Sequence, residues 1–370
     1  MSGRVLIWVQ HLLGFGHFAR ARVVAEALRD AGFAVTLVSG GVTPAGAAPA
    51  GVDFVQLPSV RAKDEMFDEL VDSTGRDVGP ALHEARRDLL LETFQAMRPA
   101  AIITETFPFG RRLLSFELTA LLEAARDASW RPKIVSSVRD VLQRPRKDAR
   151  ALGMVERARA FYDAVMVHGD PNVLRLEESF AETAGIAARC VYTGYICAEV
   201  PDAGLPRREI LVSAGGGAAG RGLIEAAIAA QRLSRLAQSS WTFVTGPLSE
   251  DLPGADGAIV VRSLPDFRVR LGAAAVSVSQ AGYNTLLETV RAGTPAVVVP
   301  FETEREQEQA MRAAAFEARG LIRVVRATEL TPAALAAAID DVHGSRPPKH
   351  DIDFRGAAGT VRAMQMVLRS

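Results

Sequence analysis

Residues 276–302 read VSVSQAGYNTLLETVRAGTPAVVVPFE, and this stretch decides the fold class. A valine-rich apolar run at 275–278 leads through a glycine into a segment with helical periodicity at 283–292. A second valine-rich run follows at 296–299, after a Gly-x-Pro turn. Continuous apolar strands separated by an amphipathic helix are typical of a parallel sheet that is buried on both faces. The stretch therefore predicts an α/β fold.

The same alternation of short apolar runs and longer helical segments extends along the whole chain. In the first half it predicts strands at 5–10, 35–39, 54–57, 101–104, 133–137, 164–167 and 191–193, and helices at 19–31, 81–97, 112–128 and 149–162. In the second half it predicts strands at 210–213, 241–245, 259–261, 275–278, 296–299 and 322–325, and helices at 223–236, 283–292, 309–319 and 332–341. We interpret this as two doubly wound, Rossmann-like sheets.

The length of 370 residues favours two domains. A segment rich in proline and helix-breaking residues at 199–206 is expected to join them. We therefore expect an N-terminal domain at 1–198 and a C-terminal domain at 199–350, followed by a tail at 351–370 whose helix crosses back to the first domain. Ligands of such sheets bind beyond the carboxyl ends of the strands, so both domains are expected to face one cleft.

Composition excludes several classes of function. The 43 basic side chains balance 43 acidic ones, and this neutral net charge argues against broad nucleic-acid binding. Cys190 and Cys197 are too few for a disulfide framework and lack the spacing of metal ligands. No apolar run reaches the ~18–20 residues that span a bilayer, and the apolar start at 5–9 is too short for a signal peptide. We expect a soluble, cytoplasmic protein, and a peripheral membrane contact stays open.

Each half begins with a glycine-rich turn between its first strand and first helix. Residues 11–19 read HLLGFGHFA and residues 215–220 read GGGAAG, both with the spacing of a dinucleotide-binding turn. Such a site also needs an acidic residue after the next strand, but those strands end in Ser39-Gly40 and Thr245-Gly246. A nicotinamide dehydrogenase is therefore disfavoured. The turns still offer backbone N–H groups at a helix N-terminus, where anions bind.

Individual residues in these turns suggest chemistry. His17 is either a structural histidine that caps a helix or a general base, because an imidazole titrates near neutral pH. In the opening stretch, Gly282 allows close approach of the backbone to a phosphate, and the helix that follows offers N–H groups to a pyrophosphate. Thr285 adds a hydroxyl, and Glu288 is placed to accept hydrogen bonds from a ribose diol.

The C-terminal half resembles the nucleotide-sugar domain of the family 28-like glycosyltransferases related to the bacterial lipid II N-acetylglucosaminyl transferase, which adopt the GT-B fold. The matching segments are 215–217, 279–288, 293–301 and 309–313. Near the N-terminus, Gly14-Phe-Gly16-His17 occupies the place of the family's glycine-rich acceptor loop. TETFPFGRR at 104–112 and SVRD at 137–140 resemble a subgroup of predicted glycosyltransferases.

The resemblance implies roles for single residues. Those around the donor diphosphate would be Gly215, Gly216, Gly217, Gln280, Ala281, Gly282, Asn284 and Thr285. The nucleoside would be held by Glu288 on the ribose and by backbone groups of Arg262 to Leu264 on the base, and the sugar hydroxyls by Glu302 and Gln309. The acceptor would be bound by Gly14, Gly16, Phe107, Arg111 and Arg139. The family's Gln-x-x-Asn-Ala motif ends in Arg312-Ala here, so the sugar is left open.

The resemblance also implies metal-independent chemistry without a cofactor, because helix dipoles and N–H groups stabilise the leaving diphosphate. The sequence has no His-Glu-x-x-His motif, no cysteine pair and no Gly-x-x-x-x-Gly-Lys phosphate loop. One Asp-x-Asp exists at Asp351 and Asp353, but it follows two prolines and is interpreted as a loop or helix cap.

The expected reaction is inverting transfer of a sugar from a nucleotide-sugar, with a UDP-sugar favoured, to an acceptor hydroxyl. We expect His17 to be the catalytic base, with Glu105 as the second candidate. Arg111, Arg112, Arg139 and Arg146 are either solvated or recognise an anionic or lipid-linked acceptor. Two alternatives stay open: a nucleotide-sugar hydrolase or 2-epimerase on the same fold, and a non-catalytic nucleotide-sugar-binding protein.

Overall fold

The computed structural model describes residues 3–12, 14–44, 46–64, 68–201, 204, 206–214, 220–246, 257–303 and 306–370. The chain forms two compact units. Unit 1 comprises Met1–Ile196 together with Arg355–Ser370, and unit 2 comprises Cys197–Phe354. The chain leaves unit 1 after Ile196 and returns to it at Arg355, whereas the sequence predicts boundaries after residues 198 and 350.

A seven-stranded parallel sheet forms the centre of unit 1, in the order β3-β2-β1-β6-β7-β8-β9. Its strands are β1 (Arg4–Val9), β2 (Ala34–Ser39), β3 (Asp53–Gln56), β6 (Ala101–Glu105), β7 (Lys133–Arg139), β8 (Ala164–His168) and β9 (Cys190–Tyr192). The side chains from Val5 to Val9 are at most 1% exposed, as expected for a central strand that is covered on both faces.

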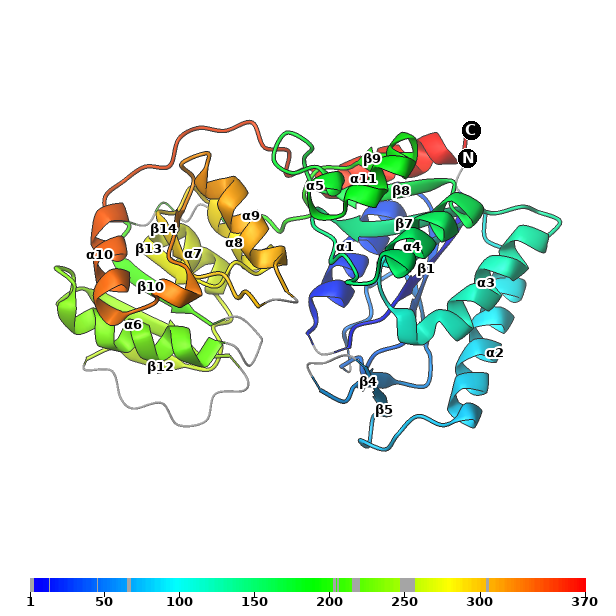
Figure 1. Ribbon diagram of the computed structural model, residues 1–370, viewed down its shortest axis with the longest axis horizontal. Helices are drawn as coiled ribbons and strands as arrows, with labels where there is room; N and C mark the ends of the chain where they lie inside the picture. Colours follow the sequence, from blue (N-terminus) through cyan, green and yellow to red (C-terminus); the bar gives the residue numbers. More distant parts are fainter. Residues whose placement is uncertain are drawn as a thin grey trace. The chain divides into compact units, whose positions relative to one another are not determined.

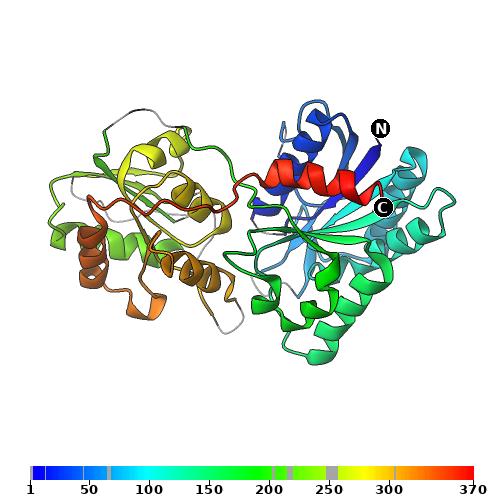
Figure 2. The same cartoon turned by 90° about the horizontal axis from the view of Figure 1, so that it is seen from above.

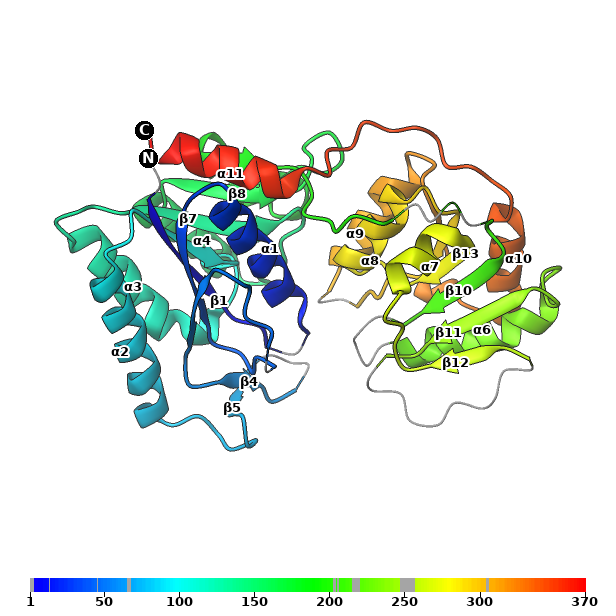
Figure 3. The same cartoon turned by 180° about the vertical axis from the view of Figure 1, so that it is seen from behind.

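Helices cover both faces of this sheet, as Figures 1 and 3 show. Val5, Ile7 and Val9 point to the face covered by α1 (Gly16–Asp30) and α11 (Gly356–Val367). Leu6 and Trp8 point to the opposite face, which is covered by α2 (Pro80–Met97) and α3 (Ser115–Asp127). On the same side, α4 (Asp148–Phe161) packs over β7 and β8. Helices on both faces of a parallel sheet confirm the predicted α/β class.

Helix α11 packs against α1 and β8, and it is the red helix of Figure 2. Two glycines allow this close packing. A Cβ atom on Gly359 would lie 1.8 Å from the carbonyl oxygen of Thr193, and one on Gly356 would lie 2.5 Å from that of Gly194. A side chain at either position would therefore push the helix away from the end of β9.

The sequence patterns do not predict the shortest elements of unit 1. These are the antiparallel hairpin of β4 (Val60–Ala62) and β5 (Leu70–Asp72), α5 (Leu176–Ser179) and the 3₁₀ segment η2 (Ala181–Arg189). The 3₁₀ turn η1 (Arg112–Leu114) begins the helix predicted at 112–128. Strands of three residues and a helix of four are too short to show a period of apolar positions, and a 3₁₀ segment has three residues per turn instead of the α-helical 3.6.

Unit 2 contains a six-stranded parallel sheet in the order β12-β11-β10-β13-β14-β15. Its strands are β10 (Glu209–Ser213), β11 (Ser240–Val244), β12 (Ile259–Val261), β13 (Ala274–Ser279), β14 (Ala296–Val298) and β15 (Arg323–Val324). Helices α6 (Arg221–Leu233) and α10 (Pro332–Val342) pack on one face, where Trp241 and Phe243 belong to the core. The remaining elements are α7 (Phe267–Ala273), α8 (Tyr283–Arg291), α9 (Glu308–Glu317) and the 3₁₀ turn η4 (Ala327–Glu329).

Candidate functional site

The strand orders locate two candidate sites. In unit 1 the chain winds outward from β1 toward β2 on one side and from β6 toward β7 on the other, so the order reverses between β1 and β6. In unit 2 the same reversal lies between β10 and β13. Ligands of doubly wound sheets bind at the carboxyl ends of the two strands that flank such a reversal. Both units thus offer a binding position of the same topological kind.

The first site consists of His17, Arg20, Glu105, Arg111 and Arg139. His17 is the second residue of α1, directly after β1, and Glu105 is the last residue of β6. The Nδ1 atom of His17 lies 2.8 Å from Oε1 of Glu105, although the two residues are 88 positions apart. The pair spans the reversal because the carboxyl ends of β1 and β6 are neighbours.

Burial and charge fix the protonation of this pair. Burial lowers the pKa of His17 to about 3, and although Glu105 raises it, Arg111 and Arg139 lower it further. Burial alone would raise the pKa of Glu105, but the cationic groups around it, Arg20 and Arg111 among them, hold the pKa below its ordinary value. At neutral pH the pair is therefore a neutral imidazole beside a carboxylate.

This protonation assigns a role to each nitrogen of His17. A carboxylate only accepts hydrogen bonds, so the Nδ1–H group donates to Glu105 and the Nε2 atom carries the lone pair. The imidazole side chain is 23% exposed, whereas Glu105 is 1% exposed. The sequence offered His17 and Glu105 as alternative bases. The structure instead brings the two side chains into contact with each other.

Sequence reasoning missed two residues that hold Glu105. The Arg20 guanidinium donates to Oε1 of Glu105, and its side chain is 2% exposed. The Thr106 hydroxyl donates to the same oxygen at 2.8 Å. Arg20 follows His17 by three positions on α1, and this spacing places both side chains on one face of a helix. That spacing was a signal for Arg20, whereas nothing in the sequence pointed to Thr106.

The loop after β6 has a fixed conformation. Thr106 and Arg111 have positive φ angles of 65° and 60°, and the Phe107–Pro108 peptide bond is cis. The carbonyl oxygen of Phe107 accepts hydrogen bonds from the hydroxyls of Thr104 (2.9 Å) and Ser136 (2.8 Å). The Phe107 side chain is 1% exposed in the core, so it can act on an acceptor only through the position of this loop.

The other residues predicted to bind the acceptor lie in different surroundings. Gly14 is exposed, and Gly16 begins α1. Arg111 is 11% exposed and lies 3.9 Å from Oε2 of Glu105, and Arg139 ends β7 with a half-buried side chain. By contrast, the two further arginines that the sequence singled out are exposed: Arg112, which pairs with Asp68 at 3.7 Å, and Arg146.

The second site is built around the N-terminus of α8, at the carboxyl end of β13. Gly282 is the N-cap residue, and a Cβ atom at this position would meet no other atom within 4 Å. The space beside the first turn of α8 is therefore open, and the first N–H groups of a helix have no partners within that helix. Ala281 is buried, Gln280 and Thr285 are half-buried, and Asn284 is exposed. Gly215, Gly216 and Gly217 lie outside the described residues.

Glu288 lies on the buried side of α8. It is 7% exposed, and Oε1 accepts a hydrogen bond from Nε of Arg268 on α7 at 2.8 Å. The Arg268 side chain is 54% exposed, so this pair reaches the surface at one end. Glu288 therefore already has a cationic partner, which the sequence did not reveal.

The remaining residues predicted to bind the donor are spread over three loops. The backbone carbonyl of Arg262 accepts from Gly246 N–H at 3.0 Å, and that of Leu264 accepts from Phe267 N–H at 3.2 Å. Glu302 lies 3.5 Å from Arg326. The Gln309 side-chain oxygen accepts from the backbone N–H of Phe301 at 3.1 Å and so ties α9 to the loop after β14.

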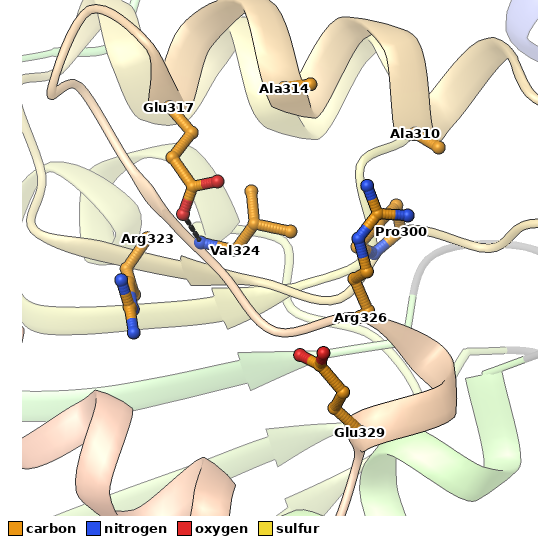
Figure 4. A pocket seen from close by; sticks show the side chains of 8 residues that line it. All are labelled: Pro300, Ala310, Ala314, Glu317, Arg323, Val324, Arg326 and Glu329. Carbon is orange, nitrogen blue, oxygen red and sulfur yellow. Dashed lines mark hydrogen bonds between the residues drawn. The ribbon is translucent and has the colours of Figure 1, made fainter.

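A small pocket of about 230 Å³ opens between α9 and β15 (Figure 4). It is lined by Pro300, Ala310, Ala314, Glu317, Arg323, Val324, Arg326 and Glu329. Glu317 accepts a hydrogen bond from the backbone N–H of Val324 at 2.7 Å, as the dashed line in Figure 4 shows. The pocket contains none of the residues predicted to bind the donor, although Arg326 pairs with Glu302. The pocket lies at the β15 edge of the sheet and not at the strand-order reversal between β10 and β13.

The described residues contain no group of three or more His, Cys, Asp or Glu side chains placed to hold a metal ion. No helix in this part of the chain combines the length and the apolarity needed to cross a membrane.

Comparison with known families decides what the second unit is. Residues 252–351 match the model of the glycosyltransferase family 28 C-terminal domain. The matched segment lies within unit 2. The family resemblance expected from the sequence is therefore confirmed for this part of the chain, and the match includes β13, α8 and the loop with Glu302.

A curated relative of the family 28 domain is similar over a short region. The chain is 35% identical over 80 residues to the UDP-N-acetylglucosamine–N-acetylmuramyl-(pentapeptide) pyrophosphoryl-undecaprenol N-acetylglucosamine transferase of Rhizobium rhizogenes. This region is 22% of the chain and 21% of the relative, so the match spans about a fifth of that relative's length.

Solved structures resemble the whole chain, beyond the family 28 domain. The calicheamicin glycosyltransferase CalG4 matches with a TM-score of 0.60 at 16% identity, over 100% of this chain and 95% of its own. MurG of Acinetobacter baumannii matches with a TM-score of 0.61 at 15% identity, over 98% of this chain and 99% of its own. The fold is thus GT-B, as predicted, and the glycosyltransferase prediction is confirmed at the level of domain family and fold.

Proposed function

We propose that this protein is an inverting, metal-independent glycosyltransferase that moves a sugar from a UDP-sugar to an acceptor hydroxyl. The observation that carries the proposal is the 2.8 Å contact between His17 and Glu105 at the strand-order reversal of unit 1. A neutral imidazole oriented by a buried carboxylate is a general base. The family 28 domain of unit 2 supports a nucleotide-sugar as the other substrate. The name of the Rhizobium relative, which includes UDP-N-acetylglucosamine, supports uridine as the base.

The proposed step is a single displacement. The acceptor hydroxyl gives its proton to Nε2 of His17, while its oxygen forms a bond to the anomeric carbon of the sugar. The bond between that carbon and the diphosphate oxygen breaks, and the nucleoside diphosphate leaves with the electron pair. Attack on the side opposite the leaving group inverts the anomeric centre. The carboxylate of Glu105 stabilises the imidazolium that forms.

The leaving diphosphate needs stabilisation of its negative charge. The N-terminal turn of α8 supplies backbone N–H groups and the positive end of a helix dipole. The open space beside Gly282 allows a phosphate to approach these groups. We assign the diphosphate to this turn, which performs the charge stabilisation that a divalent cation provides in other transferases.

The proposal is tested by donor binding and by acceptor-dependent turnover. UDP at ~100 times its dissociation constant should stabilise the protein by ~2.7 kcal/mol and raise its melting temperature equally with and without EDTA. UDP-sugar should then be consumed only when an acceptor is present. Release of free sugar or of a new nucleotide-sugar without acceptor would instead show a hydrolase or an epimerase. A melting temperature unchanged by any nucleotide would refute the donor site itself.

A further inference from the structure

Arg111 is a buried cation without a hydrogen bond. Its side chain is 11% exposed, and among the described residues its guanidinium donates to no acceptor. Its Nε and Nη2 atoms are both buried and unpaired. The nearest recorded charge is Oε2 of Glu105 at 3.9 Å, which is an ion pair too long for a hydrogen bond. Buried donors without acceptors are rare because they lose their hydration, so Arg111 calls for a partner.

The backbone holds Arg111 in this position. Arg111 itself has a φ angle of 60°, and Thr106 at the start of the same loop has one of 65°. Residues other than glycine adopt such angles rarely, and they cluster where a site requires them. Hydrogen bonds from Thr104 and Ser136 to the Phe107 carbonyl anchor the loop between these two residues. The Arg111 guanidinium is therefore presented by a fixed loop.

Positive charge exceeds negative charge in the first site. The guanidinium groups of Arg20 and Arg139 both act on that of Arg111, and the charges of Arg20 and Arg111 act on the carboxylate of Glu105. Burial lowers the pKa of Arg111, and Arg139 and Arg20 lower it further against the opposing effect of Glu105. Oε1 of Glu105 already accepts from Arg20 and Thr106 and contacts His17. Only Oε2 of Glu105 is left to face Arg111; it is buried without a hydrogen bond, and at 3.9 Å it accepts none from the guanidinium.

We propose that Arg111, with the charge of Arg139 in support, binds a phosphate group of the acceptor beside His17. This assignment rests on the proposed function, because it places the phosphate on the substrate that His17 deprotonates. A guanidinium group binds two phosphate oxygens through parallel N–H groups, which would satisfy its unpaired donors. Oε1 of Glu105 contacts His17, and Oε2 of the same carboxylate faces Arg111. Because both residues adjoin one carboxylate, a phosphate on Arg111 would lie close to the hydroxyl that His17 deprotonates.

The phosphate can belong to a soluble molecule or to a lipid headgroup. Phe15 and Val42, on the loops after β1 and β2, are 39% and 43% exposed, and Phe15 lies two positions before His17. Apolar side chains at this edge are compatible with either source. The experiment therefore has a soluble arm and a membrane arm.

In the soluble arm, inorganic phosphate is titrated while the imidazole proton resonances of His17 are followed by NMR. The His17→Ala variant identifies these resonances among the six histidines. Arg111→Gln should raise the phosphate concentration at half-saturation by about tenfold or more, because hydrogen bonds to a charged group are lost. Arg112→Gln is the matched control: it removes the same charge at the next residue, which is 51% exposed, and should change the midpoint less than about twofold.

In the membrane arm, the protein is mixed with phosphatidylcholine vesicles that contain or lack phosphatidylglycerol. Binding that requires phosphatidylglycerol and falls in Arg111→Gln but not in Arg112→Gln assigns the phosphate to a lipid. A phosphate response of His17 without vesicle binding assigns it to a soluble acceptor. Either result supports the subsite.

Two results would overturn the proposal: phosphate that leaves His17 unchanged, or Arg111→Gln with the midpoint of the wild type. Should Arg111→Gln not fold, Arg111→Lys keeps the charge, removes the two-pronged group and should bind phosphate several-fold more weakly. Melting shifts with UDP on the same samples separate the two proposals. A UDP shift without a phosphate response refutes only the subsite, whereas a phosphate response without a UDP shift refutes only the donor site.

Discussion

The two candidate sites of this protein lie at equivalent strand-order reversals but consist of different chemical groups. In unit 1 the site consists of charged side chains, with Glu105 and Arg20 almost completely buried around the His17 imidazole. In unit 2 the described part of the site consists mainly of backbone: a helix N-terminus and a glycine with open space beside it, together with one ion pair between the buried Glu288 and the exposed Arg268. The strand topology determines where a ligand binds, and the chemical groups at the site determine which reaction that ligand can undergo.

The difference follows from the chemistry assigned to each unit. Deprotonating a hydroxyl requires a group with a free lone pair that can take up the proton, and a neutral imidazole such as that of His17 supplies one. Holding a diphosphate requires several fixed N–H donors, which a helix N-terminus supplies without desolvating a side-chain charge. The first site should therefore be sensitive to single side-chain changes in turnover. Ligand affinity at the second site should be sensitive to substitutions that fill the open space beside its backbone.

The largest expected effect is that of His17→Ala. We expect kcat to fall by about 10²–10⁴-fold, because the general base is removed, while the dissociation constant of UDP stays unchanged. Turnover is measured with saturating UDP-sugar and acceptor, and UDP binding is measured by calorimetry. If UDP affinity fell while turnover stayed normal, His17 would belong to the donor site and the division of labour between the units would be wrong.

Glu105→Gln should affect stability and turnover together. Removing the carboxylate leaves the buried Arg20 and Arg111 charges without their shared partner, which costs about 3–5 kcal/mol in the free energy of unfolding. Denaturant unfolding measures this cost. Glu69→Gln is the control, because Glu69 is 63% exposed and its pair with Lys63 lies at the surface, where solvent screens it. Equal effects of the two substitutions would show that the first site is no more than a surface ion pair.

The smallest expected effect on stability is that of Gly282→Ala. A methyl group here meets no other atom within 4 Å, and the φ angle of −60° suits alanine, so the free energy of unfolding should fall by no more than about 1 kcal/mol. UDP affinity should nevertheless fall by about tenfold, because the methyl group occupies the space assigned to the diphosphate. Gly79→Ala, at the N-cap of α2 in unit 1, is equally unobstructed and should leave UDP affinity unchanged. Unchanged affinity in Gly282→Ala would move the diphosphate away from α8.

The regular elements could be predicted because their information is local. The stretch 275–299 predicted strand, helix and strand at 275–278, 283–292 and 296–299, and the structure has β13, α8 and β14 within about two residues of these bounds. Apolar periodicity depends only on residues that are close in the sequence, so it can be recognised without knowledge of the tertiary structure. The helix α7 was missed because seven residues, with a glycine at position 272, show too little of a period.

The sites were predictable only in part. The family 28 resemblance pointed to Glu288 and His17 through motifs that are continuous in the sequence. It could not show that Arg268 from α7 pairs with Glu288, or that Arg20 and Thr106 hold Glu105. Such contacts join elements that come together only when the strands pair, so they cannot be predicted from the spacing of residues along the chain.

By itself, then, the sequence determined the α/β class, the succession of strands and helices, and the family of the second unit. Tertiary structure alone decided which charged residues became a site. Arg111 and Arg112 are adjacent and identical, yet the first is 11% exposed beside Glu105 and the second is 51% exposed beside Asp68. The reason is physical: the positive φ angle of Arg111 turns its side chain toward the carboxyl end of β6, while Arg112 begins the 3₁₀ turn that leads away from it.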